Sequence, residues 1–597
     1  MSNTRNSRLL GLFASPLALH CAKTDLDVLM LKKYFPFLGW FPMRGDGIRA
    51  DLIAGLTVAL VLIPQSMAYA ELAGLPIWMG LYAAFIPVVL AGLWGSSNHL
   101  QTGPGATMAF IISSALIPLA AVGSTEYNAL AVQLAFMVGI IWALVAILRL
   151  SFVMNFLSRP VIEGFINAGG ILIAASQVGK ILGIQSSGAM HVVSDLVAMM
   201  GQLDTINWIS MAMGTASLLL LLLGRRYFPR IPVALIVATV STAMVYFLGL
   251  ANPEHVAFPL TIVGEIPSGL PKPMWPVPTG ENVLRLLPGA LVFAFVGFME
   301  TTSVARGIAA RSHQKLSVNQ EAAGQALASL GSAFSGGQPI NGSFSRSALN
   351  FATGAKSGMA AVFTGLFVMV FLLFCTPLFY HLPKTVLAAI IISAVLKLIN
   401  FRQLASFMKV SKADGATAWI TFAATLAFAP ELEKGILLGA SFSILMHLYS
   451  MMRPHVAVLG RHPDGALRDA DLHDLEIDHV LPAIRFDGRL FFANAAYFED
   501  QVHSAVDRIP DVQHVAIIFN GINAIDSSGT EMLKELHGQL NHRGVQVLFV
   551  GVKNQVLKVI RASGLEDTIG KQHFFGTYDH ARDHAAETLA TAQTYSI

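Results

Sequence analysis

The chain has 597 residues, of which 54% are hydrophobic and only 13% are charged, whereas about a quarter of the residues are charged in a typical soluble domain. The mean hydropathy is +0.60, and the formal net charge of +3 is too small to suggest a nucleic-acid partner. Charged residues are sparse from 50 to 452 and return to an ordinary frequency from 453 to 597. This composition excludes an ordinary soluble protein and predicts a membrane protein with a soluble C-terminal part.

The N-terminal stretch contains a short apolar run interrupted by Pro16. Because many longer apolar segments follow, we interpret residues 1–48 as a cytoplasmic segment rather than as a signal peptide. The two cysteines are Cys21, in this segment, and Cys375, in an apolar run, so we expect no disulfide framework.

Membrane-spanning helices need about 20 mainly apolar residues. The clear candidates are 51–70, 76–95, 127–149, 160–182, 207–224, 231–250, 284–305, 359–380, 383–400, 414–429 and 433–452. Three weaker candidates, which are shorter or rich in glycine, are 103–121, 320–336 and 341–354. Together they predict about fourteen segments in a transport domain over 49–452.

The distribution of basic residues predicts the orientation of these segments. An even number of segments places both termini on one side of the membrane. The loops on that side hold Arg149, Arg159, Arg225, Arg226, Arg230, Arg306, Arg311, Lys315, Lys356, Arg402, Lys409 and Lys412. The other side holds only Lys180, Lys272, Arg285, Lys384 and Lys434. We therefore expect a multi-pass protein of the inner (plasma) membrane with both termini in the cytoplasm.

The membrane part contains an internal repeat. The segment "RADLIAGLTVALVLIPQ" is followed by "TGPGATMAF", which begins at Thr102, and "RLLPGALVFAFVGFMETT" is followed by "INGSFSRSA", which begins at Ile340. Seven segments per half is an odd number, so the second half should be inverted. Interrupted segments at matching positions of two halves indicate the binding site of a transporter.

Residues 453–590 show a different pattern. The runs 514–520 and 545–551 are typical of buried strands, and 527–544 and 554–564 are typical of helices that end at glycine. This alternation predicts a small α/β domain, followed by a tail over 591–597.

The polar stretches 103–108 and 341–346 lie in the membrane part, where broken helices persist only beside protein or a wet cavity. A helix that begins there points free N–H groups and the positive end of its dipole into that cavity, which attracts an anion. Pro104 can lie in the first turn of such a helix. Glycine allows the backbone to approach a ligand closely, and hydroxyl groups add donors. These residues are Gly103, Gly105, Gly342, Ser343, Ser345 and Thr107.

Two charged residues, Arg346 and Glu300, lie in this apolar setting. Placing Arg346 there costs at least about 2.5 kcal/mol, and a bound oxyanion or a nearby carboxylate would offset the cost. Glu300 is a candidate for taking up a proton. The alternative is a purely structural ion pair between the two.

The first predicted span carries Gln65 directly after Pro64, which favours a kink. The amide of Gln65 can donate to an anion or satisfy the freed backbone, and Tyr69, one turn later, can line the same cavity or simply pack.

Taken in order, several stretches resemble the SulP/SLC26 anion transporter family. They are "DLIAGLTVALVLIPQSMAYAELAG", "GLYAAF", "TGPGATMAF", "NQEAAGQALASLGSAFSG", "GSFSRSALNFATGAKSG" and the C-terminal "NAIDSSGTEML", which resembles a STAS domain. The resemblance implies a polytopic α-helical membrane protein of fourteen segments in two inverted seven-segment repeats. It also implies a homodimer and a core domain that moves against a gate domain by an elevator-type alternating-access mechanism.

The resemblance also implies an anion site between the third and tenth segments. Its positions fall on Gln65, Tyr69, Gly105, Ala106, Thr107, Ser343, Phe344, Ser345 and Arg346, and the coupling carboxylate falls on Glu300. Members that resemble sodium-bicarbonate symporters carry Asp at this carboxylate and Thr one turn later, where this chain has Glu300 and Val304. Losing a hydroxyl ligand weakens a sodium site, so we expect proton-coupled sulfate uptake, with bicarbonate, chloride and dicarboxylates as alternatives.

The motif "DSSG" resembles the phosphorylated loop of anti-sigma-factor antagonists, with Ser527 at the matching position. The simpler interpretation is that Asp526 or Ser527 caps a helix. A cytoplasmic partner on this domain is a further possibility.

Other function classes find less support. We find no HExxH zinc motif, and "GLEDTIGK" does not have the spacing of a phosphate-binding loop. We therefore expect no enzyme, no metal site and no cofactor. An anion channel on the same scaffold, or a membrane sensor that signals through the C-terminal domain, remain the alternatives of another class.

Overall fold

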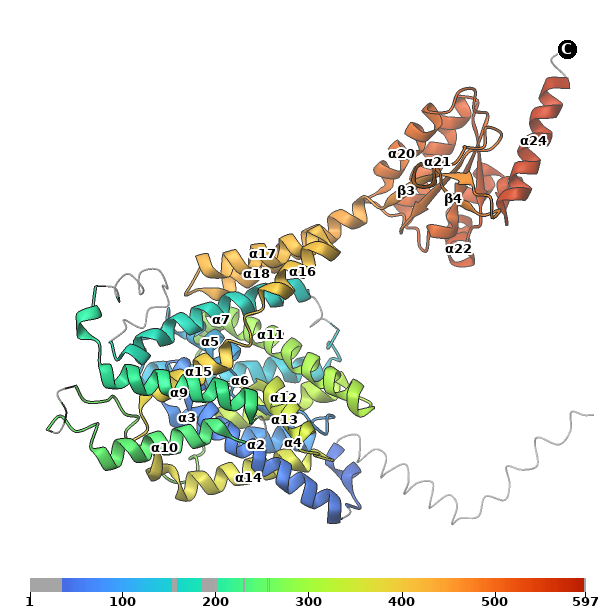
Figure 1. Cartoon of the computed structure of the whole chain (residues 1–597). Helices are drawn as coiled ribbons and strands as arrows, with labels where there is room; N and C mark the ends of the chain where they lie inside the picture. Colours follow the sequence, from blue (N-terminus) through green and yellow to red (C-terminus); the bar gives the residue numbers. More distant parts are fainter. Residues whose placement is uncertain are drawn as a thin grey trace, which may run out of the picture. The chain divides into compact units, whose positions relative to one another are not determined.

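The computed structural model describes residues 35–594 except 44, 153–157, 185–198, 200, 229–230, 255, 257 and 277. The chain forms two compact units, one ending at Ser443 and the other beginning at Ile444 (Figure 1). Most of the predicted N-terminal segment, with Pro16 and Cys21, lies outside the described residues, as does Arg230.

The first unit is helical. Its helices are α2 (Gly45–Leu72), α3 (Ile77–Ala83), α4 (Ile86–Trp94), α5 (Ala106–Leu116), α6 (Thr125–Ile147), α7 (Arg159–Leu182), α9 (Trp208–Tyr227), α10 (Val233–Leu248), α11 (Gly280–Ser312), α12 (Val318–Phe334), α13 (Phe344–Ala352), α14 (Met359–Phe374), α15 (Lys384–Val395), α16 (Phe401–Val410), α17 (Lys412–Ala427) and the first part of α18 (Leu432–Met452), which continues past Ser443. Short 3₁₀ helices cover Pro36–Trp40, Leu203–Thr205 and Thr376–Phe379.

Each of the predicted spans coincides with a helix, apart from 76–95, which contains both α3 and α4. Pro87 lies in the first turn of α4 and has no N–H to donate to the preceding turn, which favours a helix start at this point over a continuous helix. In the described range, seven helical stretches are long and apolar enough to cross a membrane, and four shorter helices are also apolar. Helix α16 was not predicted because its ten residues are too few to span a bilayer.

The helices pack into two groups. The core group contains α2, α4, α5, α6, α11, α12, α13 and α14, and the gate group contains α7, α9, α10, α15, α16 and α17. Small residues permit close packing within each group. A Cβ atom at Gly164 of α7, for example, would lie 2.4 Å from the carbonyl oxygen of Ala418 in α17.

A two-stranded sheet connects the two halves of this unit. Strand β1 (Thr102–Gly103) pairs antiparallel with β2 (Asn341–Gly342), with Thr102 opposite Gly342 and Gly103 opposite Asn341. Helix α5 follows β1, and α13 follows β2, after short links. The two short helices therefore begin close together.

Two buried carboxylates, which sequence analysis did not single out, connect distant segments. Asp51 of α2 accepts hydrogen bonds from the backbone N–H of Lys356 (2.6 Å) and Ser357 (3.1 Å) and from the Ser357 hydroxyl (2.6 Å). Glu321 of α12 accepts from the backbone N–H of Ser96 (2.6 Å) and Ser97 (2.5 Å) and from the Ser96 hydroxyl (2.8 Å). A buried charge is tolerated when several donors satisfy it, so both carboxylates stabilise the loops they bind.

The second unit is an α/β domain. Its sheet has the strand order β4 (Leu467–Asp469), β3 (His455–Arg461), β5 (Ala483–Asp487), β6 (His514–Ile518), β7 (Gln546–Val550) and β8 (Phe574–Phe575). Strand β3 is antiparallel to both neighbours, and the others are parallel. The helices are α19 (Ala470–His473), α20 (Ala495–Asp507), α21 (Ser527–His542), α22 (Asn554–Ala562), α23 (Leu565–Ile569) and α24 (Tyr578–Thr594). The four elements predicted from 514 to 564 are confirmed as β6, α21, β7 and α22.

Alternating side chains bury both faces of this sheet. In β6, Val515 and Ile517 pack in one core with α20, α21 and α22, and Ala516 and Ile518 pack in a second core with α24. The sequence of a strand that is covered on both faces is a continuous apolar run. For this reason β6 was recognised from the sequence.

A polar contact fixes α24 on this second core. The Asp478 carboxylate accepts hydrogen bonds from the Arg582 guanidinium, from the Tyr578 hydroxyl (3.3 Å) and from the Val480 N–H (2.9 Å). Burial raises the pKa of Asp478, but the hydrogen bonds and charge of Arg582 and the backbone N–H groups outweigh it, so the net pKa lies below its ordinary value.

We expect Asp478→Asn to destabilise the unit 444–597 by about 1–2 kcal/mol at pH 7. A carboxyl group whose pKa is lowered by folding stabilises the fold above its unfolded pKa, about 3.9, and this contribution is lost as the pH falls through the folded value. Urea unfolding of wild type and variant should therefore differ at pH 7, and the difference should be smaller at pH 3. Asp500→Asn, at an exposed position of α20, is the control. An equal difference at both pH values would contradict this account.

Candidate anion-binding site

The starts of α5 and α13 leave backbone donors free. Gly105 is the N-cap of α5 and Ser343 is the N-cap of α13, and neither helix has a side-chain cap among the described residues. The first N–H groups of a helix have no acceptor within it, and the helix dipole gives them a partial positive charge. Gly105, Ala106 and Ser343 are partly exposed, and Ser345 is exposed, so these donors lie next to accessible space.

Arg346 follows two residues after the start of α13 and is 1% exposed. Its Nη1 atom donates a long hydrogen bond of 3.5 Å to the Gln65 side-chain oxygen. Its Nε and Nη2 atoms are buried and have no hydrogen-bond partner in the described part of the chain. A buried guanidinium with free donors is costly unless an anion satisfies them. Among the described residues Arg346 and Glu300 form no ion pair in direct contact, but the two side chains lie within electrostatic range of each other.

Glu300 of α11 is connected to the same place through Asn341. The Asn341 amide donates to the Glu300 carboxylate at 2.8 Å, and the backbone N–H of Gly342 donates to the Thr301 hydroxyl at 2.9 Å. Glu300 is partly exposed, whereas Asn341 is 1% exposed. Asn341 was not among the predicted site residues, although an amide beside glycine in a polar stretch of an apolar region was a signal for it.

Helix α2 contributes Gln65 and Tyr69. Pro64 lies inside α2, as expected, and Gln65 is partly exposed. Tyr69 is 4% exposed, and its hydroxyl lies within electrostatic range of Arg346 and Glu300. The structure therefore places Gln65 and Tyr69 of α2 close to the two helix starts and to Glu300. Of the predicted hydroxyl donors, Thr107 is buried, and the Ser343 and Ser345 hydroxyls lie 3.4 Å apart.

Three glycines of this site lie close to neighbouring side chains. A Cβ atom at Gly103 would lie 3.2 Å from Arg346 Nη2, and one at Gly105 would lie 2.8 Å from the Asn341 side-chain oxygen. At Gly342 a Cβ atom would lie 3.0 Å from side-chain atoms of Leu100 and Thr301. These positions leave little room for a larger residue, and the approach of their backbone to a ligand stays a prediction. Pro104 precedes the N-cap of α5 and does not lie in its first turn.

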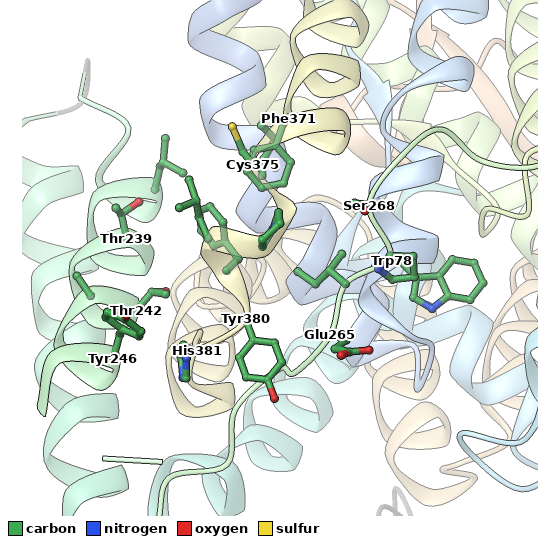
Figure 2. A pocket seen from close by; sticks show the side chains of 18 of the residues that line it. Trp78, Thr239, Thr242, Tyr246, Glu265, Ser268, Phe371, Cys375, Tyr380 and His381 are labelled. Carbon is green, nitrogen blue, oxygen red and sulfur yellow. The ribbon is translucent and has the colours of Figure 1, made fainter. Parts of the chain in front are cut away.

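A cavity of about 1330 Å³ lies apart from these residues. Figure 2 shows its lining, which includes Trp78, Tyr246, Glu265, Tyr380 and His381. Its lining is mainly aromatic and aliphatic, contains the carboxylate of Glu265 and includes none of the predicted anion-site residues. It is therefore poorly suited to an inorganic anion.

Ser527 lies at the first position of α21 and is exposed. The Asp526 side chain caps this helix by accepting from the Gly529 N–H at 2.8 Å. Asp526 is therefore the capping residue of this motif, and a regulatory role of Ser527 stays a prediction.

Comparisons with known proteins identify the family of the chain. Residues 48–421 match the family model of the sulfate permease family, and residues 474–581 match the STAS domain. Sulfate transporter 4.1, chloroplastic, of Arabidopsis thaliana is 33% identical over 558 residues, which cover 91% of this chain and 81% of that protein. A probable sulfate transporter of Mycobacterium tuberculosis is 31% identical over 534 residues, 89% of this chain and 94% of that protein.

Two solved structures share the fold. The overall structure of SLC26A9 has a TM-score of 0.85 at 22% identity and covers 96% of each chain. The transmembrane domain of the cyanobacterial bicarbonate transporter BicA has a TM-score of 0.57 at 20% identity, covering 67% of this chain and 98% of that one. The chain belongs to the sulfate permease (SulP/SLC26) family of anion transporters and carries a C-terminal STAS domain.

Proposed function

We propose that this protein takes up sulfate together with a proton, by an elevator-type movement of the core group against the gate group. The observation that carries the proposal is the buried Arg346 guanidinium, two of whose nitrogen atoms have no partner in the described range, beside two uncapped helix starts. The names of the sulfate transporters it resembles support sulfate as the cargo.

A charge balance favours proton coupling. Each helix start contributes about half a positive charge, so the two starts and Arg346 together supply about +2. An ionised Glu300 reduces this sum to about +1, which leaves the two charges of sulfate incompletely balanced. When Glu300 is protonated, the positive charge is again about +2 and balances the two negative charges of sulfate. Binding of a dianion should therefore favour uptake of a proton at Glu300, which is linked to the site through Asn341.

An ion pair between the two helix groups offers a test of their relative movement. Lys180, in the last turn of α7, lies 3.1 Å from Glu71, near the end of α2. The Glu71 side chain is only 14% exposed. Because α2 belongs to the core group and α7 to the gate group, sliding one group along the other would separate this pair.

The same N–H and guanidinium donors also suit other anions. Backbone N–H groups discriminate poorly among small anions, so bicarbonate, chloride and dicarboxylates are the alternative substrates. Val304, one turn after Glu300, is buried and offers no oxygen to a sodium ion. An anion channel or a sensor that signals through the STAS domain is the alternative of another class.

The proposal includes the cellular setting. We place the protein in the inner (plasma) membrane with both termini in the cytoplasm, as a homodimer, with the STAS domain available to a cytoplasmic partner. Radiolabelled sulfate uptake into proteoliposomes, with and without an inward proton gradient, tests the function. Stimulation by the gradient supports symport, gradient-independent flux of many anions indicates a channel, and no flux indicates a sensor or another substrate.

Arg346→Ala should raise the KM for sulfate at least about 10-fold, because a hydrogen bond to a charged group contributes about 1.5–3 kcal/mol. Ser345→Ala should have a smaller effect of about threefold, as expected for a neutral donor. Arg306→Ala, at an exposed position of α11, is the control. A wild-type KM in the Arg346 variant would refute its role in binding.

Glu300→Gln should abolish the stimulation of sulfate uptake by an inward proton gradient while sulfate still binds. The amide keeps the size of the side chain but cannot take up a proton. Glu281→Gln makes the same change at an exposed position of the same helix. If the Glu300 variant keeps a normal pH response, the coupling residue has been assigned wrongly.

A crosslink between positions 71 and 180 should stop transport. Cysteines replace Glu71 and Lys180 in a background that lacks Cys21 and Cys375, and a bifunctional thiol reagent with a reducible link joins them. We expect uptake to fall to background and to return after reduction. Each single cysteine variant, treated in the same way, is the control. Full activity of the crosslinked protein would exclude movement between these helices.

A further inference from the structure

We infer that the cavity of about 1330 Å³ is a binding site for a membrane lipid with a primary ammonium headgroup, phosphatidylethanolamine. Pockets for small ligands measure about 300–1,000 Å³, so this cavity has room for more than a small solute. It includes none of the residues assigned to the anion. The inference therefore goes beyond the proposed function and does not rest on it.

The cavity lies between the two helix groups and opens to the bilayer. Ile63 of α2 and Phe371 of α14 line it from the core group, and α10 lines it from the gate group. Phe247 and Leu378 also line the cavity and are 80% and 68% exposed. Exposed apolar side chains of a membrane unit face acyl chains, which are as apolar as leucine. An acyl chain can therefore enter the cavity from the side.

The connection between α10 and α11 closes a further side of the cavity. Its Gly264 N–H donates to the Tyr380 backbone oxygen at 3.1 Å, and its Gly269 N–H donates to the Leu372 backbone oxygen at 3.0 Å. Glu265 directly follows Gly264 and lines the cavity. These backbone contacts hold Glu265 beside Tyr380.

The cavity has a polar end and an apolar end. Figure 2 shows Glu265, Tyr380 and His381 at one end and Phe371 and Cys375 at the other. Tyr380 and His381 lie in the short connection between α14 and α15, so the polar end is at the depth where the helices end. Lipid headgroups and interfacial aromatic side chains lie at this depth. The cavity therefore suits an amphipathic molecule in the orientation of a membrane lipid.

The polar end favours an ammonium group. Among the described lining residues Glu265 is the one carboxylate, and none is a lysine or arginine. His381 Nδ1 is buried and has no hydrogen-bond partner in the described range, and it can accept a hydrogen bond when the proton of the ring is on Nε2. The rings of Tyr246 and Tyr380 lie 5.2 and 4.9 Å from the His381 ring, and aromatic faces attract a cation.

Phosphatidylethanolamine matches both ends. Its ammonium group has N–H donors for the Glu265 carboxylate and for His381 Nδ1, and its chains can fill the apolar end. Phosphatidylcholine carries the same charges but has no N–H donor. Phosphatidylglycerol carries a net negative charge, which the Glu265 carboxylate repels. The chemistry of the site therefore predicts that phosphatidylethanolamine binds most tightly and phosphatidylglycerol least tightly.

The first test uses the full-length protein, purified in detergent and freed of lipid. Native mass spectrometry measures the dissociation constants of the three dioleoyl lipids. We expect phosphatidylethanolamine to bind about 10-fold more tightly than phosphatidylcholine, because only it donates a hydrogen bond to the carboxylate. Equal constants for the three lipids overturn the inference. Equally tight binding of phosphoethanolamine, which has no chains, also overturns it, because the occupant would then be a free amine.

Substitutions at Glu265 test the headgroup contact. Glu265→Gln should raise the dissociation constant of phosphatidylethanolamine about 10-fold, and Glu265→Lys should reverse the order of phosphatidylethanolamine and phosphatidylglycerol. Glu254→Gln makes the same change at an exposed position of the same connection, outside the lining, and is the control. If Glu265→Gln and Glu254→Gln bind phosphatidylethanolamine alike, the inference is wrong.

Cys375 reports on the apolar end of the cavity without any change to the lining. It is the single cysteine of the chain once Cys21 is replaced by serine. Phosphatidylethanolamine at ten times its dissociation constant should slow alkylation of Cys375 by N-phenylmaleimide about 10-fold. Val370→Cys, in a background without Cys21 and Cys375, is the control, because position 370 of α14 is 46% exposed and lies outside the lining. Slowing at both positions, or at neither, overturns the inference.

The outcomes distinguish this inference from the proposed function, because no binding measurement requires transport. If lipid binding depends on Glu265 and the protein takes up no sulfate, the inference stands and the proposed function fails. If a proton gradient drives sulfate uptake and Glu265→Gln binds phosphatidylethanolamine like the wild type, the proposed function stands and the inference fails.

Discussion

The pairing of β1 with β2 is the constraint on which the membrane unit depends. Two helices begin inside the apolar part of the chain, and backbone groups there must find partners. Thr102 and Gly103 pair with Gly342 and Asn341, and the Ser343 N–H donates to the Gln101 oxygen at 2.9 Å. The chain thereby satisfies the backbone just before each helix and leaves free only the donors at the helix starts.

The surrounding polar side chains support this pairing. The Gln325 amide donates to the Thr102 hydroxyl at 2.8 Å, and the Ser347 hydroxyl accepts from the Gln101 N–H at 2.8 Å. These two contacts are buried and hold the base of the site in place. The side-chain amide of Gln101 and the side-chain oxygens of Gln325 and Asn341 nevertheless lack a partner among the described residues, as do two nitrogen atoms of Arg346. Arg346 differs from these neutral groups because its unpaired donors carry a fixed positive charge.

Much of this arrangement could be predicted from the sequence. Apolar length located the spans, and glycine, proline and hydroxyl residues in an apolar region located the two helix starts, because these features are local. The buried carboxylates Asp51 and Glu321 were missed because each binds a distant segment of the chain. The break between α3 and α4 was missed although its cause, Pro87, is local, and α16 was missed because it is too short to span a bilayer. Asn341 carried a local signal, as an amide beside glycine in a polar stretch, but its hydrogen bond to Glu300 and its closeness to Gly105 depend on the fold.

The buried carboxylates also constrain how the chain is made. Asp51 binds the backbone at 356–357, Glu321 binds the backbone at 96–97, and β1 pairs with β2. Each half of the membrane unit therefore has unsatisfied polar groups until the other half has been synthesised. During synthesis, the first half enters the bilayer some 240 residues before Gly342 can meet Thr102. A nascent chain of this design must be shielded from lipid by the insertion machinery until its second half has emerged, because the bilayer offers no substitute for the missing donors.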